Sequence, residues 1–133
     1  MAGVKQHRNP PTVHVPAAAY THQIEVSSDE RLLVLSGQLG MRSDGSVPDD
    51  PIEQLDVALT NVERNLAEAG MGLKDLVKLT FYLVGEVDLA RWRTVLGSRL
   101  GGHEPCMTLL FVAGLAQPAF RIELDAWATR AAH

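Results

Sequence analysis

The stretch that decides the fold is residues 104–128, which read EPCMTLLFVAGLAQPAFRIELDAWA. Its pattern predicts two strands, 106–112 and 120–128, joined by a linker that contains Gly114 and Pro118. Side chains alternate between the two faces of a strand, so Ile122 and Leu124 share an apolar face while Glu123 and Asp125 share a polar one. The apolar face can seal a core. The polar face must meet water, another subunit or a ligand.

Composition places the chain among ordinary globular proteins. It has 133 residues, of which 46% are hydrophobic and 21% charged, enough for one domain with its own core. A net charge of −4 argues against a nucleic-acid partner, and the apolar runs are too short to span a membrane. No secretory signal is visible after Met1, and a lone cysteine, Cys106, fits a reducing compartment. We therefore expect a cytoplasmic protein with neither a nucleic-acid nor a membrane partner.

The first half of the chain predicts an arm, two strands and a helix. Residues 1–15 contain prolines and few apolar residues in sequence, so we expect a flexible N-terminal arm before a single domain at 16–133. Segments 20–26 and 31–36 flank a polar turn and predict a hairpin, and the apolar run 32–35 is typical of a central strand covered on both faces. Asp50 is placed to cap a helix that begins at Pro51 and stops near Gly70, with a polar face that includes Gln54.

The second half predicts a strand, a helix and the two strands with which we began. Residues 75–84 alternate as a strand does, and residues 88–100 carry apolar side chains at spacings of three and four before Gly101 and Gly102. The order β-β-α-β-α-β-β predicts an α+β fold with one mixed sheet and two helices on one side of it. The uncovered side would carry Tyr82, Leu110 and Trp127 beside its charges, which favours a subunit interface over a face turned to water.

Few residues suggest chemistry on their own. The five histidines are scattered without metal-ligand spacing, and the glycines do not form a phosphate-binding loop, so we expect no metal and no cofactor. Cys106 is either a nucleophile activated by a nearby histidine or, more often at the start of a strand, a small apolar filler. Glu123 is the best candidate for a general base if another subunit covers it, the alternative being a solvated carboxylate paired with Arg121.

Between residues 16 and 128 the chain carries an ordered set of motifs. They are Tyr20, Ser36-Gly37-Gln38, Ile52-Glu53-Gln54-Leu55 with Asn65-Leu66 and Ala69-Gly70, the run 73–80, Pro105, and Glu123-Leu124-Asp125-Ala126-Trp127-Ala128. Taken together, this set resembles the YjgF–RidA family of enamine/imine deaminases, also called the endoribonuclease L-PSP family. The resemblance implies a chorismate-mutase-like fold and a homotrimer with small-molecule sites at the subunit clefts.

The resemblance also implies roles for residues. Glu123 matches the family's catalytic glutamate if the linker 113–119 contains one extra residue; without it Ile122 takes that place, but strand parity favours Glu123. Tyr20 and Gly37 match pocket positions, and backbone groups near Gly37 and Cys106 would orient the ligand. Where typical members have an arginine that holds the substrate carboxylate, this chain has Met107.

Two functions stay open on this basis. In the first, Glu123 activates water to hydrolyse an imine or enamine with atypical substrate preference, the substrate being neutral or held by Arg121 or Arg42. In the second, the trimer is catalytically inactive and binds a small ligand or serves as a regulator. RNA cleavage, attributed to some family members, is the least favoured because the chain is acidic. The sequence names neither the physiological substrate nor a pathway.

Overall fold

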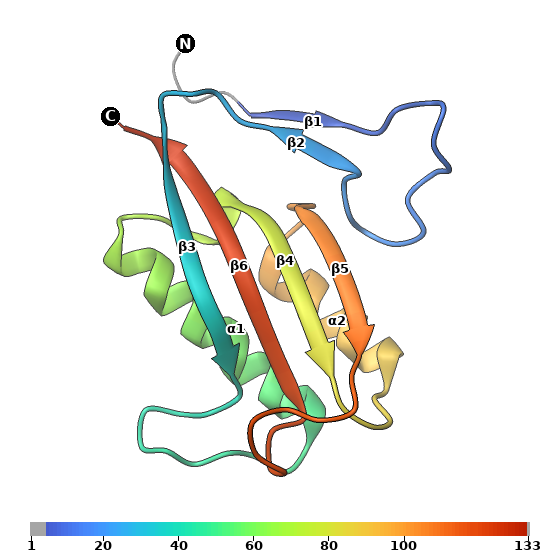
Figure 1. The fold of residues 1–133 in the computed structure, drawn as a ribbon, viewed down its shortest axis with the longest axis vertical. Helices are drawn as coiled ribbons and strands as arrows, with labels where there is room; N and C mark the ends of the chain where they lie inside the picture. The colour runs from blue at the N-terminus through green and yellow to red at the C-terminus, as the bar shows by residue number, and fades with distance from the viewer. Residues whose placement is uncertain (1–4, 133) are drawn as a thin grey trace.

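A four-stranded mixed sheet forms the centre of the computed structural model, which describes residues 5–132. Its strand order is β3 (Glu30–Leu39), β6 (Ile122–Ala131), β4 (Leu76–Leu83) and β5 (Cys106–Phe111). β6 runs antiparallel to both neighbours, whereas β4 and β5 are parallel. The helices α1 (Pro51–Glu68) and α2 (Leu89–Leu100) cover the same side of the sheet (Figure 1). The predicted α+β class is confirmed, although β5 and β6 are separated by β4 rather than adjacent.

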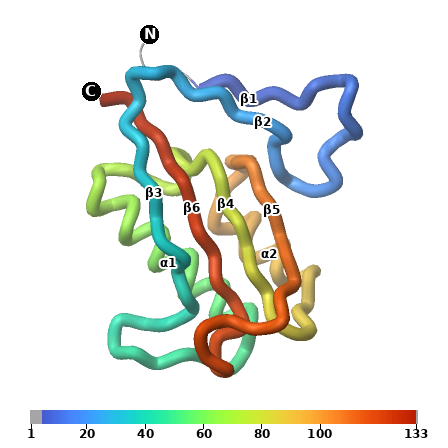
Figure 2. The backbone as a smooth tube through the Cα atoms, viewed as in Figure 1, coloured from blue at the N-terminus to red at the C-terminus, as the bar shows by residue number. Residues whose placement is uncertain are grey.

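A separate two-stranded ribbon precedes the main sheet. β1 (Gln6–Arg8) pairs antiparallel with β2 (Gln23–Glu25), and Figure 2 shows this ribbon beyond the starting ends of β4 and β5. The predicted hairpin between segments 20–26 and 31–36 is therefore wrong. Arg8 stabilises the actual pairing, because its guanidinium donates to Gln23 Oε1 at 3.0 Å and forms an ion pair with Glu25. Part of the expected N-terminal arm, residues 6–8, is thus a strand.

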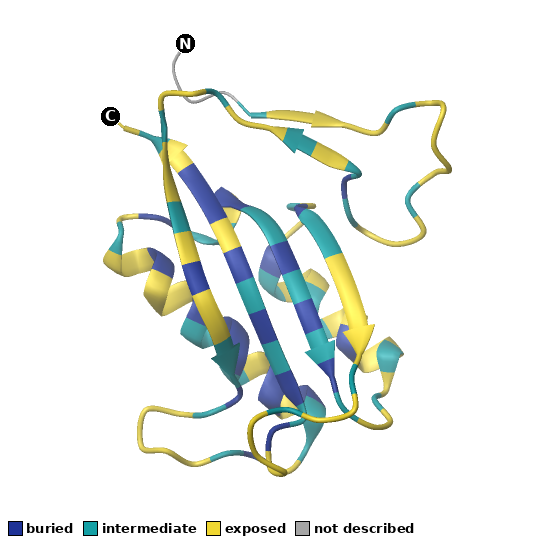
Figure 3. Ribbon diagram, viewed as in Figure 1, coloured by how far each residue is buried: buried dark blue, intermediate teal, exposed yellow. Residues whose placement is uncertain are grey.

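β3 is an edge strand and not the central strand predicted from its apolar run. Among the strands of the described residues it pairs with β6 alone, and its outward side chains Leu32 and Val34 are 58% and 54% exposed. Leu35 faces the helices and is buried. Figure 3 shows the exposed residues of β3 and β5 on either side of the alternately buried β4 and β6. We call the side of the sheet turned away from the helices the open face.

α1 is built from an amphipathic stripe and well-defined ends. The Asp50 carboxylate accepts a hydrogen bond from Ile52 N at 3.0 Å, Pro51 occupies the first turn, and Gly70 follows the helix with φ of 73°. Leu55, Leu59 and Val62 pack into the core beneath the sheet.

The expected solvation of Gln54 is wrong, because this residue on α1 is completely buried. Its amide donates to the carbonyls of Pro48 and Ala119 at 2.8 and 2.9 Å and accepts from the backbone N–H groups of Arg121 and Ile122. Gln54 therefore links α1 to the loop that precedes it and to the loop that leads into β6.

α2 begins and ends as predicted. Asp88 accepts from Ala90 N and Arg91 N, and Gly101 ends the helix in the left-handed region with φ of 58°. Trp92 packs edge-on against Phe81 of β4, with ring centroids 5.1 Å apart. Between residues 5 and 132, no helix combines the length and apolar character needed to cross a bilayer.

Candidate active site and ligand cavity

Glu123 lies on the open face, directly over Gly37. The register of β3 with β6 shifts between Leu35 and Gln38, and this bulge places Gly37 against the Glu123 side chain. A Cβ atom at Gly37 would overlap Glu123 Oε2, so only glycine leaves the carboxylate its present position. The fold thereby brings into contact Gly37 and Glu123, two candidate site residues that lie 86 positions apart in the sequence.

The neighbours of Glu123 on the open face are polar and partly buried. Tyr82, which lies opposite Glu123 in the β4–β6 register, donates its hydroxyl proton to Asp125 Oδ2 at 3.0 Å. This hydrogen bond raises the pKa of Tyr82, and partial burial and the charges of Asp125 and Glu123 act in the same direction. The phenol thus stays protonated at neutral pH and holds Asp125 in place next to Glu123.

Cys106 also lies on the open face, opposite Lys78 in the β4–β5 register. Its side chain is half-buried, and burial raises the pKa of the thiol although the Lys78 charge works against this. A thiol with a raised pKa is mostly protonated at neutral pH and is a poor nucleophile. The environment fits the filler interpretation better than the catalytic one.

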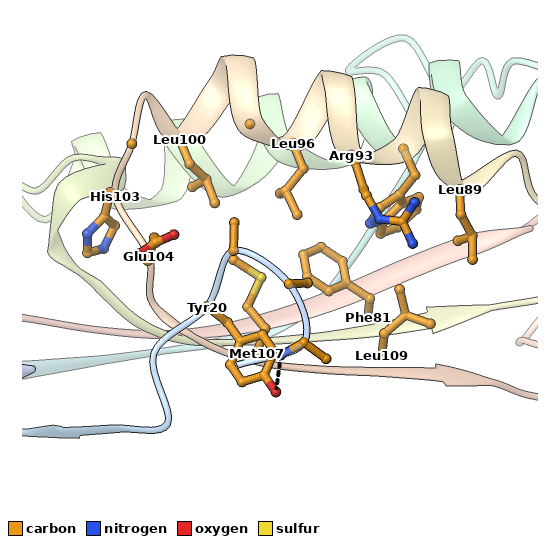
Figure 4. A pocket seen from close by; sticks show the side chains of 16 residues that line it. Tyr20, Phe81, Leu89, Arg93, Leu96, Leu100, His103, Glu104, Met107 and Leu109 are labelled. Carbon is orange, nitrogen blue, oxygen red and sulfur yellow. Dashed lines mark hydrogen bonds between the residues drawn. The ribbon is translucent and has the colours of Figure 1, made fainter. Parts of the chain in front are cut away.

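A cavity of about 570 Å³ lies on the other side of the sheet, between α2 and the strands β4 and β5. Figure 4 shows Tyr20 and Met107 together in it, beneath the α2 residues Leu96 and Leu100. The segment 17–20 forms one wall, and Tyr20 Oη accepts a hydrogen bond from Ala17 N at 3.2 Å. Most of the lining is apolar, and its polar groups are Arg93, His103, Glu104 and the Tyr20 hydroxyl.

One chain does not bring all the expected site residues together. Met107 lies opposite Leu79, which is buried on the helix side, whereas Glu123 lies opposite Tyr82 on the open face. Because paired residues point to the same side of a sheet, Glu123 and Met107 project from opposite sides. Tyr20 and Met107 form one group and Gly37 and Glu123 another, with the sheet between them.

Arg121 and Arg42, which the sequence analysis considered as holders of a substrate carboxylate, do not line this cavity. The Arg121 guanidinium donates to the backbone carbonyls of Val84 and Glu86 at 2.8 and 2.9 Å, which fixes it to the loop after β4. Arg42 lines a smaller hollow beside α1 and donates to Ser46 Oγ at 3.3 Å.

The cavity residue that sequence reasoning missed is Arg93 of α2. The sequence analysis gave Arg93 no role, although it stands directly after Trp92 in the apolar stripe of the helix. Within residues 5–132, no three His, Cys, Asp or Glu side chains are grouped so as to hold a metal ion.

Comparison with known proteins identifies the family and the fold. The fold is the α+β fold of the YjgF, chorismate-mutase-like proteins, and residues 12–130 match the family model described as Endoribonuclease L-PSP. The chain therefore belongs to the endoribonuclease L-PSP family, also known as the YjgF or Rid family. No curated protein matches the chain.

Several solved structures are similar. The Rid family protein YyfB from Yersinia pestis, described as of unknown function, superposes with a TM-score of 0.83 at 27% identity, over 93% of this chain and 97% of that one. A putative endoribonuclease L-PSP from Entamoeba histolytica gives 0.68 at 26% identity, over 85% and 89%. Escherichia coli TdcF with bound serine gives 0.70 at 23% identity, over 90% and 98%, which is a likeness of fold.

Proposed function

We propose that the protein is a homotrimeric hydrolase that deaminates a reactive imine or enamine, with Glu123 as the residue that activates water. The observation that carries this proposal is the Glu123 carboxylate held over Gly37 on the open face. Each site would combine Glu123 and Gly37 of one protomer with the Tyr20–Met107 cavity of the next, because one chain presents these groups on opposite sides of its sheet. The single cysteine suits a cytoplasmic location.

The open face supports assembly. Leu32, Val34, Leu110 and Trp127 are each 40% exposed or more, although they flank half-buried carboxylates. Exposed apolar groups on one face of a sheet favour association with another copy of the chain. Covering this face would also exclude bulk water from around Glu123, so that a single positioned water could react there.

The chemistry needs only a base and a positioned water. Glu123 takes a proton from water as the oxygen attacks the carbon of the protonated C=N bond, which gives a neutral carbinolamine. Glu123 then passes this proton to the nitrogen and takes up the hydroxyl proton as the C–N bond breaks, so that ammonia and a carbonyl compound leave and Glu123 afterwards releases the remaining proton to solvent. An enamine would first tautomerise to the imine. The bound serine of the TdcF structure supports a small amino-acid-like ligand for this fold.

Met107 would set the substrate preference. An arginine–carboxylate pair contributes about 1.5–3 kcal/mol, which a thioether does not supply. We therefore expect weak turnover of short imino acids such as 2-iminopropanoate, the tautomer of 2-aminoacrylate. Met107→Arg should raise that turnover about tenfold or more, measured as ammonia release from imino acid generated in the assay. An unchanged rate in a correctly folded Met107→Arg variant would contradict the role assigned to this position.

The test of the proposed function is a screen of imines with and without a carboxylate, run on wild type and on Glu123→Gln. Wild type should hydrolyse at least one imine, and Glu123→Gln should lose about a hundredfold or more of that rate because the general base is gone. Glu68→Gln, which removes an exposed carboxylate from α1, is the matched control and should keep the full rate. Equal rates for wild type and Glu123→Gln would refute catalysis by Glu123.

The alternative is a trimer that binds a small ligand without turning it over. The apolar Met107 wall favours it, since the arginine of typical deaminases is missing from this position. Ligand binding in the cavity with no hydrolysis of any imine in the screen would establish this alternative. We do not propose an RNA substrate, because the net charge of −4 opposes binding to a polyanion.

A further inference from the structure

The cavity beneath α2 has an apolar body and charged groups at separate places along the helix. Phe81, Leu96, Met107 and Leu109 line its body, while His103 and Glu104 lie together near the C-terminal end of α2 (Figure 4). Arg93 lies toward the other end, between Leu89 and Leu96. The seven residue-to-residue steps of helix from Arg93 to Leu100 correspond to about 10 Å. The cavity is therefore long enough for an extended chain with different chemistry at its two ends.

The arginines of α2 differ in their partners. Arg91 pairs with Asp50 at 2.8 Å, and Arg99 pairs with Asp56 at 2.7 Å and with Glu63 at 3.4 Å. Arg93, the third, has no hydrogen bond or ion pair to any residue in the described range 5–132. It is the arginine of this helix that lines the cavity. A guanidinium without a carboxylate partner, beside an apolar cavity, can bind an anion from outside the chain.

We propose that this cavity binds a monocarboxylate with an extended apolar chain, whose carboxylate pairs with Arg93 and whose chain lies along Leu96 and Met107. This proposal names the substrate class of the proposed function. Its statement that the ligand is a substrate rests on that function, whereas its statement that the ligand binds in this cavity does not. Glu104 at the opposite end disfavours a second acidic group on the ligand. Met107 then forms part of the apolar wall against which the chain of the ligand packs.

Size and polarity agree with this class. A volume of about 570 Å³ lies in the usual range for small-molecule sites. A short polar imino acid would leave most of the apolar lining in contact with water, whereas each methylene buried against it contributes about 0.8 kcal/mol. Affinity should therefore grow with the length of the apolar chain.

Gly97 offers a way to block the cavity without disturbing the fold. It lines the cavity four residues after Arg93, on the same face of α2, and a Cβ added there has no atom within 4 Å. Helical side chains point back toward the N-terminus, so a leucine at 97 would extend toward Arg93. Replacing glycine inside a helix also removes an intrinsic cost of about 1 kcal/mol, so the variant should fold at least as stably as wild type.

The test compares octanoate with its neutral analogue octanamide by calorimetric titration of the full-length protein. Wild type should bind octanoate about five- to tenfold more tightly than octanamide, as expected for a partly solvated guanidinium pair. Arg93→Gln should abolish that preference, while Arg64→Gln, which removes an exposed arginine from α1, should keep it. Gly97→Leu should abolish binding of both probes, and Gly97→Ala should keep it.

Three outcomes would overturn the inference. The first is equal affinity of wild type for octanoate and octanamide. The second is an equal loss of preference in Arg64→Gln and Arg93→Gln. The third is no binding of either probe to wild type, which is the result expected if a neighbouring protomer fills the cavity. Binding that survives when every imine fails to turn over would refute the proposed function and leave this inference intact.

Discussion

At the scale of single residues, the contact between Gly37 and Glu123 is the feature on which catalysis would depend. Gly37→Ala should lower the hydrolysis rate about tenfold or more, because the new Cβ overlaps Glu123 Oε2 and forces the carboxylate away. The melting temperature should change little, since the displaced group is the end of a flexible side chain. Rates and thermal melts measured together check this, and a fully active Gly37→Ala variant would contradict it.

Gly40 is the matched contrast to Gly37. A Cβ there would lie 2.6 Å from the Cα and 2.7 Å from the carbonyl oxygen of Gln54, and this backbone cannot move as a side-chain end can. Gly40→Ala should therefore lower the melting temperature where Gly37→Ala does not. The pair separates loss of function from loss of fold.

Cys106 should react slowly with thiol reagents. The raised pKa of its thiol leaves less thiolate at pH 8 than in an unperturbed cysteine, and the reaction rate should keep rising as the pH increases toward that raised value. We expect alkylation of the folded protein to be about tenfold or more slower than that of the urea-unfolded chain at the same pH. Alkylation as fast as in the unfolded chain would show that the thiol is exposed and unperturbed.

At the scale of elements, α1 depends on the buried amide of Gln54. Gln54→Leu replaces the amide with an apolar side chain of similar size and leaves two carbonyls and two N–H groups without partners. Each lost partner of a buried polar group costs about 1–3 kcal/mol, so the variant should lose at least about 3 kcal/mol of unfolding free energy. Gln117→Leu, at an exposed loop position, is the control, and urea denaturation gives both values.

The sequence predicts the helices better than the strands. Asp50, Pro51 and Gly70 mark α1 through local chemistry, and Asp88 and Gly101 do the same for α2. The strands β1 and β2 have three residues each, which is too short to show an alternation of apolar and polar side chains. Their pairing also joins segments that are far apart in the sequence, whereas a hairpin prediction connects only neighbouring segments across a turn. The central place of β6 depends on long-range pairing, which no local pattern records.

The same limit applies to the candidate site. Strand parity correctly puts Glu123 on the polar side of β6, but parity does not show that Gly37 lies beneath it, because that contact depends on the bulge in β3. Gln54 was assigned to a solvated surface because a helical pattern does not reveal which loops fold over the helix. Arg93 was overlooked for the corresponding reason, since its cavity is completed by β4, β5 and the segment 17–20.

At the scale of the whole molecule, the sheet separates the two halves of the expected site. Glu123 and Gly37 lie on the open face, while Tyr20 and Met107 line the cavity under α2. The exposed apolar residues Leu32, Val34 and Trp127 lie on the same side as Glu123. A ring of protomers, each presenting its open face to the next, would bring complementary halves together, and each site would then belong to two chains.

The most direct measurement mixes two inactive variants, Glu123→Gln and Gly97→Leu, by unfolding and refolding them together at equal amounts. If each site combines Glu123 of one protomer with the cavity of its neighbour, random mixing in a cyclic trimer leaves about one quarter of the sites intact. We predict about one quarter of the wild-type hydrolysis rate from mixed trimers, with each parent inactive yet trimeric by sedimentation. Mixed trimers without regained activity, or wild-type protein that sediments as a monomer, would contradict the shared site.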